Sequence, residues 1–198
     1  MPDIKHFDPE ATLDTVVRLF WRQGFASTGI QDIVDATGLN RSSLYATYGG
    51  KQELYRAALD RYAASRSRPV LERLTADERG LPALRDFFSG LVETRCSGEY
   101  ARWGCMISNA HAGAGNGDPE VLALLDRQHA ALRDALRQTL LTARRLGQLA
   151  EGADPDTGAE MLALLAYGIN LRSRAGVDVG RLRGTAMAAI DALAGTEA

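Results

Sequence analysis

The residues best suited to make specific polar contacts lie close together, just after position 39. Asn40 is a favourable helix cap, and Arg41, Ser42 and Ser43 would fill the exposed first turn of the helix that it starts. Arginine can contact a guanine edge or a phosphate, and serine can reach a base edge or a phosphate. Short polar groups at the leading end of a helix also let its backbone come close to a groove of DNA. The segment therefore predicts a helix that contacts duplex DNA.

A second short helix is predicted immediately before this one. Thr28 and Gln31 fit a capping box at the start of a helix over 30–37. Gly38 permits the left-handed backbone of a tight turn into the helix over 41–47. Two helices joined in this way can place the second one in the major groove.

Positive charge is scarce in this part of the chain. The whole chain has 23 Lys and Arg against 25 Asp and Glu, and residues 1–62 hold seven against eight. Attraction to DNA must therefore be local, through a few phosphate contacts and through helix N-termini. Lys51, at the predicted start of the next helix, is well placed to meet a phosphate together with the free amides there.

Motifs for catalysis and for metal binding are absent from the sequence. There is no HExxH, paired CxxC, GxSxG or P-loop motif, and His6, His111 and His129 lack metal-ligand spacing. The glycine-rich stretch 113–117 lacks the spacing of a phosphate-binding loop and follows no strand. We expect no catalytic residues, no metal and no cofactor.

Composition indicates an ordinary globular protein. The chain has 198 residues, of which 45% are apolar and 24% charged, enough for a packed core. No apolar run is long enough to span a bilayer, and the N-terminus does not resemble a signal peptide. Cys96 and Cys105 are too few for a secreted disulfide framework. We expect a cytoplasmic protein that does not contact a membrane.

Helix signals dominate the whole chain. Asp-Pro pairs at 8, 118 and 154, each followed by an acidic residue, predict helix starts. Alternating patterns rich in Val, Ile and Thr are missing, so an all-α fold is predicted. Pro69 predicts a break or kink nearby. The expected helices cover 8–24, 30–37, 41–47, 51–67, 82–96, 104–112, 119–147, 155–174 and 179–194.

Across residues 8–62 the sequence resembles the TetR family of bacterial transcriptional repressors. The residues that carry the resemblance are Gly24, Phe25, Thr28, Ile33, Gly38, Leu44, Tyr45, Tyr48, Lys51 and Leu54. It implies a three-helix DNA-binding head over 1–62 with a helix-turn-helix, and a larger helical bundle over 63–198 for ligand binding and dimerisation. It also implies DNA contacts from Thr28, Arg41, Ser42, Ser43, Tyr45, Tyr48 and Lys51, with Tyr45 and Lys51 mostly on phosphates. Where the family often has Phe, the chain has Tyr48, whose hydroxyl would suit a phosphate.

The last two predicted helices indicate an oligomer. Helices 155–174 and 179–194 are too apolar for a surface pair, although burial within one chain is the alternative. The resemblance implies a homodimer through these helices. A two-fold dimer would bind a palindromic operator with half-sites about 34–36 Å apart.

Cys105 stands at the predicted start of a helix, in a segment that resembles one branch of the family. A thiol there can be reactive toward oxidants or electrophiles, although free cysteines are often simply buried. A small-molecule inducer would need a pocket with apolar walls and a few polar groups. The candidate lining residues are Phe88, Leu91, Trp103, Met106, Asn109, His129, Tyr167 and Asn170.

These observations favour a dimeric repressor that a small molecule releases from its operator, with a kink near Pro69 transmitting the change. Two alternatives stay open: a repressor that senses oxidants or electrophiles through Cys105, and a helical module that binds a protein instead of DNA.

Overall fold

The computed structural model describes residues 8–113 and 117–195, and in this part of the chain its regular structure is helical. Only one isolated bridge, between Leu149 and Ala194, pairs extended backbone there. The predicted all-α fold is confirmed. The expected loop at 113–117 lies largely outside the described residues. The helices are α1 (Pro9–Gln23), α2 (Ile30–Thr37), α3 (Arg41–Tyr48), α4 (Lys51–Tyr62), the π-helical segment η1 (Ala63–Ser67), α5 (Arg68–Ala76), α6 (Leu81–Cys96), α7 (Met106–Ala112), α8 (Pro119–Arg145), α9 (Pro155–Arg174) and α10 (Val179–Asp191).

Three helices begin where the Asp-Pro pairs predict. The carboxylates of Asp8, Asp118 and Asp154 accept hydrogen bonds from backbone amides in the first turns of α1, α8 and α9. Proline follows each cap at a position whose amide would have no intrahelical partner. Within the described residues no helix is both long enough and apolar enough to cross a membrane.

Helix α7 begins two residues later than predicted. Gly104 has a φ of 67°, and Cys105 is extended (φ −106°, ψ 132°), so Cys105 becomes the N-cap. A Cβ at position 104 would lie 2.8 Å from the carbonyl oxygen of Asn170. Both the backbone angle and this close approach therefore require glycine.

The helix predicted over 51–67 does not break before Pro69. It continues through η1 into α5, with helical backbone at both Ser67 and Arg68. The amide of Arg68 bonds to the carbonyl of Ala63, five residues earlier. In an α-helix the proline ring would clash with the carbonyl four residues before it, and the wider π turn relieves that clash. The predicted irregularity therefore takes the form of η1.

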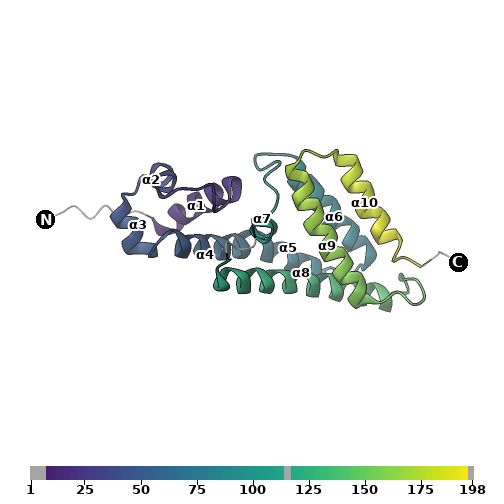
Figure 1. Ribbon diagram of the computed structural model, residues 1–198. Helices are drawn as coiled ribbons and strands as arrows, with labels where there is room; N and C mark the ends of the chain where they lie inside the picture. The colour runs from purple at the N-terminus through teal and green to yellow at the C-terminus, as the bar shows by residue number, and fades with distance from the viewer. Residues whose placement is uncertain (1–7, 114–116, 196–198) are drawn as a thin grey trace.

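Two apolar cores divide the molecule (Figure 1). At one end α1, α2 and α3 surround the first part of α4, and at the other α6 and α9 stand against α8, with α10 packed mainly on α6. The first core also takes in Met106 and Ile107 of α7 and Val121, Leu124 and Leu125 of α8. The N-terminal unit is thus packed directly onto two helices of the second unit.

Candidate nucleic-acid interface and ligand cavity

Helices α2 and α3 present a polar surface because their apolar residues point into the first core. Ile33 and Leu44 are buried, whereas Arg41 and Ser42 are exposed and Tyr45 is 47% exposed. The side chain of Asn40 accepts hydrogen bonds from the Ser43 amide at 2.8 Å and the Ser42 hydroxyl at 2.7 Å. The predicted cap is therefore in place, and the first turn of α3 is accessible.

The corner before α2 differs from the sequence prediction. The predicted capping box of Thr28 and Gln31 is wrong: Gly29 is the N-cap, and its amide donates to the Asp32 carboxylate at 2.6 Å. Thr28 is fully buried, and its hydroxyl donates to the Gly24 carbonyl at 2.7 Å. Its hydroxyl therefore holds the turn between α1 and α2 and does not face solvent. The neighbouring Ser27 is exposed and carries the accessible hydroxyl at this corner.

Tyr48 ties the end of α3 to the start of α1. Its hydroxyl donates to the carbonyl of Pro9 at 2.9 Å. Burial raises the pKa of Tyr48, and the negative charge of Asp8 adds to this effect. A phosphate contact by this hydroxyl would compete with the bond to Pro9.

The start of α4 offers a cation and unpaired amides. The Lys51 ammonium lies 4.1 Å from the centre of the Phe25 ring, a cation–π contact. Gly50 is the N-cap and provides no side-chain acceptor for the amides of the first turn. A phosphate placed here would meet the positive end of the helix dipole and the ammonium of Lys51.

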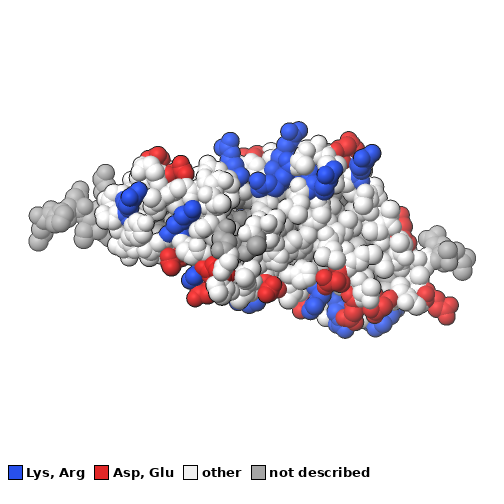
Figure 2. Space-filling view, in the orientation of Figure 1, with Lys and Arg blue, Asp and Glu red and all other residues white. Residues whose placement is uncertain are grey.

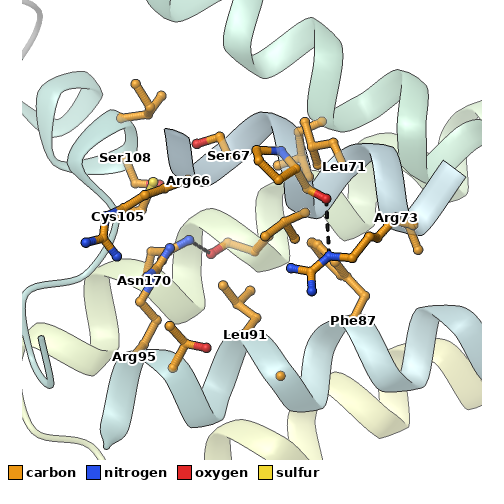
Figure 3. Close-up of a pocket in the computed structure, with 18 of the residues that line it drawn as sticks. Arg66, Ser67, Leu71, Arg73, Phe87, Leu91, Arg95, Cys105, Ser108 and Asn170 are labelled. Atoms are coloured by element: carbon orange, nitrogen blue, oxygen red, sulfur yellow. Dashed lines mark hydrogen bonds between the residues drawn. The ribbon is translucent and has the colours of Figure 1, made fainter. Parts of the chain in front are cut away.

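A cavity of about 710 Å³ lies between η1 and α5 on one side and α6, α7, α8 and α9 on the other (Figure 3). This volume suits a drug-sized molecule. Of the eight predicted lining residues, Leu91, Tyr167 and Asn170 line it. Burial raises the pKa of Tyr167 well above its usual range, so its hydroxyl stays protonated.

The other five predicted lining residues do not line this cavity. Phe88 and Met106 are fully packed in the two cores. The ring of Trp103 packs edge-to-face against that of Trp21, and the side-chain amide of Asn109 donates to the Trp103 carbonyl. His129 faces Glu160, with 3.4 Å between Nε2 and Oε1.

Several cavity residues were not predicted from the sequence. The basic ones are Arg66 in η1, Arg73 in α5 and Arg95 in α6, and the buried residue Ser108 of α7 adds a hydroxyl. The thiol of Cys105 also lines this space. Arg95 could have been predicted from the sequence, because it follows Leu91 by one helical turn and so shares a largely inward face of the helix.

The cavity wall is connected to the first core by buried contacts. The indole Nε1 of Trp21 donates to the carbonyl of Gly104 at 3.0 Å, next to Cys105. The Trp21 ring also packs edge-on against Tyr62, with ring centres 5.0 Å apart. Tyr62 itself lines the cavity, so one side chain belongs to both structures.

A second connection joins α4 to the start of α8. Arg56 and Gln52 both bind the Asp118 carboxylate, at 2.6 Å each. Burial opposes ionisation of Asp118, but these two side chains and the amides of Glu120 and Val121 hold its pKa below the usual range. The cap of α8 is thereby fixed to the helix that carries Lys51.

Comparison with known proteins identifies the family. Residues 13–58 match the family model described as "Bacterial regulatory proteins, tetR family", and residues 80–189 match "Tetracyclin repressor-like, C-terminal domain". The chain belongs to the TetR family. It is therefore a DNA-binding transcriptional regulator and not an enzyme, as the sequence predicted.

Relatives align with most of this TetR-family chain. The HTH-type transcriptional repressor ComR of Escherichia coli strain K12 is 29% identical over 179 residues, covering 90% of this chain and 85% of ComR. The uncharacterized HTH-type regulator YezE of Bacillus subtilis strain 168 is 34% identical over 155 residues, covering 78% and 79%. A cysteine mutant of the TetR-family regulator CifR, complexed with 26-base-pair operator DNA, is 23% identical with a TM-score of 0.83, covering 96% and 99%; it shows the shared fold.

The TetR-family body also carries an exposed apolar stripe. Met161, Leu164 and Leu171 of α9 are 39%, 59% and 40% exposed, and their spacing places them on one side of the helix with Gly168 between them. Figure 2 shows mainly basic side chains, with a few acidic ones among them, along the upper edge, from above α7 to the upper ends of α9 and α10. The opposite edge, along α8, mixes both signs of charge in the same view.

Proposed function

We propose that this TetR-family protein is a homodimeric repressor that a small molecule in the cavity releases from a palindromic operator. Residues 1–62 would form the DNA-binding domain, and residues 63–198 the ligand-binding and dimerisation domain. The observation that carries the proposal is the direct packing of the cavity wall onto the DNA-binding head through Tyr62 and Trp21. The name of the related ComR as a repressor supports the direction of regulation.

In this proposal few side chains contact DNA. Arg41 and Ser42 read base edges or phosphates from the exposed first turn of α3, with the half-buried Ser43 beside them. Tyr45 and Lys51 bind phosphates on either side of the Gly49–Gly50 turn. Thr28 contributes by holding the corner before α2, and Tyr48 by fixing α3 against α1.

The dimer forms through α9 and α10. The apolar stripe of Met161, Leu164 and Leu171 would pack against its copy, since exposed apolar residues on one helix face are typical of an interface. On α10 the exposed Gly184 and Ala188, one turn apart, would allow the close approach of a neighbouring helix.

Release follows from a shift between two arrangements of the body. A ligand between η1 and α6 displaces Tyr62 or the loop at Gly104, and both contact Trp21 in the head. The two heads of the dimer then no longer match the half-site spacing. The segment η1 supplies a place where the long helix can change its winding.

A binding assay on the DNA upstream of the protein's own gene tests the DNA-binding surface. We expect specific binding that survives competitor DNA and weakens with salt. Arg41→Ala should lower the affinity about tenfold to hundredfold, because one good base contact is worth about 1–3 kcal/mol. Arg145→Ala, an exposed arginine at the far end of α8, is the matched control. Equal losses in the two variants would contradict the assignment of α3.

Sedimentation velocity tests the dimer. Leu164→Arg should give monomers at concentrations where the unmodified protein is a dimer, because it places a charge in the apolar seam. Leu146→Arg changes a residue that is 54% exposed just after α8, outside this seam, and should leave the dimer intact. A dimer that persists in Leu164→Arg would place the interface elsewhere.

The position of Cys105 favours a second candidate, in which the thiol senses an oxidant or electrophile. The thiol lines the cavity one residue from the Gly104–Trp21 link, so a modified sulfur would act on the same connection. Cys105→Ser should then keep DNA binding but lose release by an oxidant such as hydrogen peroxide. Release that is unchanged in Cys105→Ser would eliminate this candidate.

A further inference from the structure

The cavity has two chemically different ends (Figure 3). Arg66, Arg95, Asn170 and Ser108 gather around Cys105 at one end. Leu71 and Phe87 lie toward the other end, with Leu91 between them, and Leu74 and Leu132 add to the apolar wall. Arg73 also lies at that end, where its Nε donates to the carbonyl of Pro69 at 3.2 Å. A ligand that fits both ends carries a polar group on an apolar skeleton.

The polar end is built around a fixed arginine. Arg95 donates through Nε to the Oδ1 of Asn170 at 2.6 Å, and Asn170 is 6% exposed. The Nδ2 of Asn170 is held in turn by the carbonyl of Ala166 at 2.8 Å. This chain of bonds orients the guanidinium, and its terminal Nη groups make no hydrogen bond or ion pair to another described residue.

The acidic residues of the cavity are already neutralised. Asp77 and Asp86 line it, but both carboxylates bind Arg79, at 2.6 and 2.8 Å. Arg66, Arg73 and Arg95 form no ion pair within the described part of the chain. The side chain of Arg66 lies over the rings of Trp21 and Tyr100, at 5.0 and 4.6 Å, which leaves its donors for other partners.

Ser108 adds a donor at the same end. Its residue is only 3% exposed, and its hydroxyl makes no hydrogen bond to another described side chain or backbone group. Since Ser108 lines the cavity, this hydroxyl is free to donate to a molecule bound there. An anion with two or more oxygens beside Arg95 would supply an acceptor for this hydroxyl, and two of its oxygens would match the forked donors of the guanidinium.

We propose that this cavity binds an organic anion, with a carboxylate or sulfonate held by Arg95, Arg66 and Ser108 and an apolar skeleton against Leu71, Phe87 and Leu91. This inference rests on the proposed role of the cavity as the regulatory site, and it assigns the ligand class.

Two dyes that share one skeleton test the charge preference. They are 1-anilinonaphthalene-8-sulfonate and its uncharged counterpart N-phenyl-1-naphthylamine, titrated by fluorescence into the full-length protein. We expect the sulfonate to bind about tenfold more tightly or better, as charge-assisted hydrogen bonds predict. Arg95→Gln and Arg66→Gln should each remove most of that preference and leave the affinity for the neutral dye unchanged.

Two control variants locate the site. Arg127→Gln removes an exposed arginine of α8 outside the cavity and should change neither affinity. Gly90→Leu should weaken both dyes, because Gly90 lines the cavity and a Cβ there meets no atom within 4 Å. The inference would be overturned if the two dyes bound with equal affinity or if neither bound. It would also be overturned if Arg95→Gln and Arg66→Gln weakened both dyes equally, or if Gly90→Leu left binding unchanged.

Failure of the regulatory role would look different. DNA binding measured with and without the bound sulfonate reports that role separately. If the sulfonate preference holds but operator affinity does not respond, the anion site stands and the ligand-released repressor does not. If the sulfonate preference is absent while other cavity ligands still release DNA, the ligand-released repressor stands and the anion site does not.

Discussion

Replacing Trp21 with phenylalanine tests the connection between the cavity wall and the head. Trp21 is 1% exposed, and its indole nitrogen donates to the Gly104 carbonyl at 3.0 Å. Phenylalanine keeps an aromatic ring in the core but has no donor and is smaller. The substitution therefore removes one buried hydrogen bond and leaves a small void.

The expected cost follows from these two effects. A buried carbonyl left without its partner costs about 1–3 kcal/mol, and the void adds about 1 kcal/mol. The free energy of unfolding should fall by about 2–4 kcal/mol. For a chain of this length each kcal/mol lowers Tm by about 2–4 °C, so we expect a drop of roughly 4–16 °C.

Thermal unfolding and amide hydrogen exchange measure the outcome. Trp103→Phe is the matched control: it also shrinks an indole, but Trp103 is only half-buried, and its indole N–H has no hydrogen bond within the described residues. We expect a smaller drop in Tm for the control, and faster exchange at the start of α7 only in Trp21→Phe. Equal Tm values for the two variants, or unchanged exchange near Gly104, would refute the reasoning.

Three further substitutions test other parts of the argument. Gly104→Ala should destabilise the protein by more than the roughly 1–2 kcal/mol of left-handed strain, because its Cβ would lie 2.8 Å from the Asn170 carbonyl. Gly98→Ala, at a similar φ of 76° but with open space around the Cβ, is the control, and the extra loss of Tm in Gly104→Ala measures the clash alone. Pro69→Ala should change operator affinity or ligand response in a gel-shift assay, because it removes the reason for the π turn; unchanged values for both would exclude η1 as the transmitting element. Asp14→Asn should lower Tm at pH 7, because the hydrogen bond from Arg61 lowers the pKa of Asp14 and the ionised carboxylate stabilises the fold. The difference in Tm should shrink below pH 3.8 and vanish as the carboxylate is protonated in the folded protein, and a difference independent of pH would show that the ionised carboxylate is not responsible.

Helix starts could be predicted from the sequence wherever the signal was local. Asp8, Asp118 and Asp154 each cap a helix through their own side chain, so the surrounding structure has little to add. The start of α2 was different, because Thr28 with Gln31 and Gly29 with Asp32 both fit a capping pattern one residue apart. Burial of the Thr28 side chain against the Gly24 carbonyl decides between them, and that contact depends on how α1 packs.

The cavity could be predicted only in part because η1 and the five helices α5 to α9 together create it. Phe88 and Leu91 are both apolar residues of α6, three positions apart, yet Phe88 is fully buried in the body core and Leu91 faces the cavity. The difference depends on the rotation of α6 relative to α5 and α9, which no local pattern encodes. Arg66 was missed for a related reason, since the π turn of η1 changes which side of the helix it occupies.

Tyr62 shows why ligand binding and DNA binding can be linked without a hinge. It is 1% exposed, it lines the cavity, and its ring packs against Trp21 in the core that also holds Ile33 and Leu44. Packed cores resist gradual deformation and change instead between discrete arrangements. An occupant that moves Tyr62 must therefore either be excluded or change the packing beneath α2 and α3. Tyr62 is followed at once by η1, so the cavity borders the segment where the winding of the long helix departs from that of an α-helix. Ligand sensing is thus expected at this junction and not deeper in the body core.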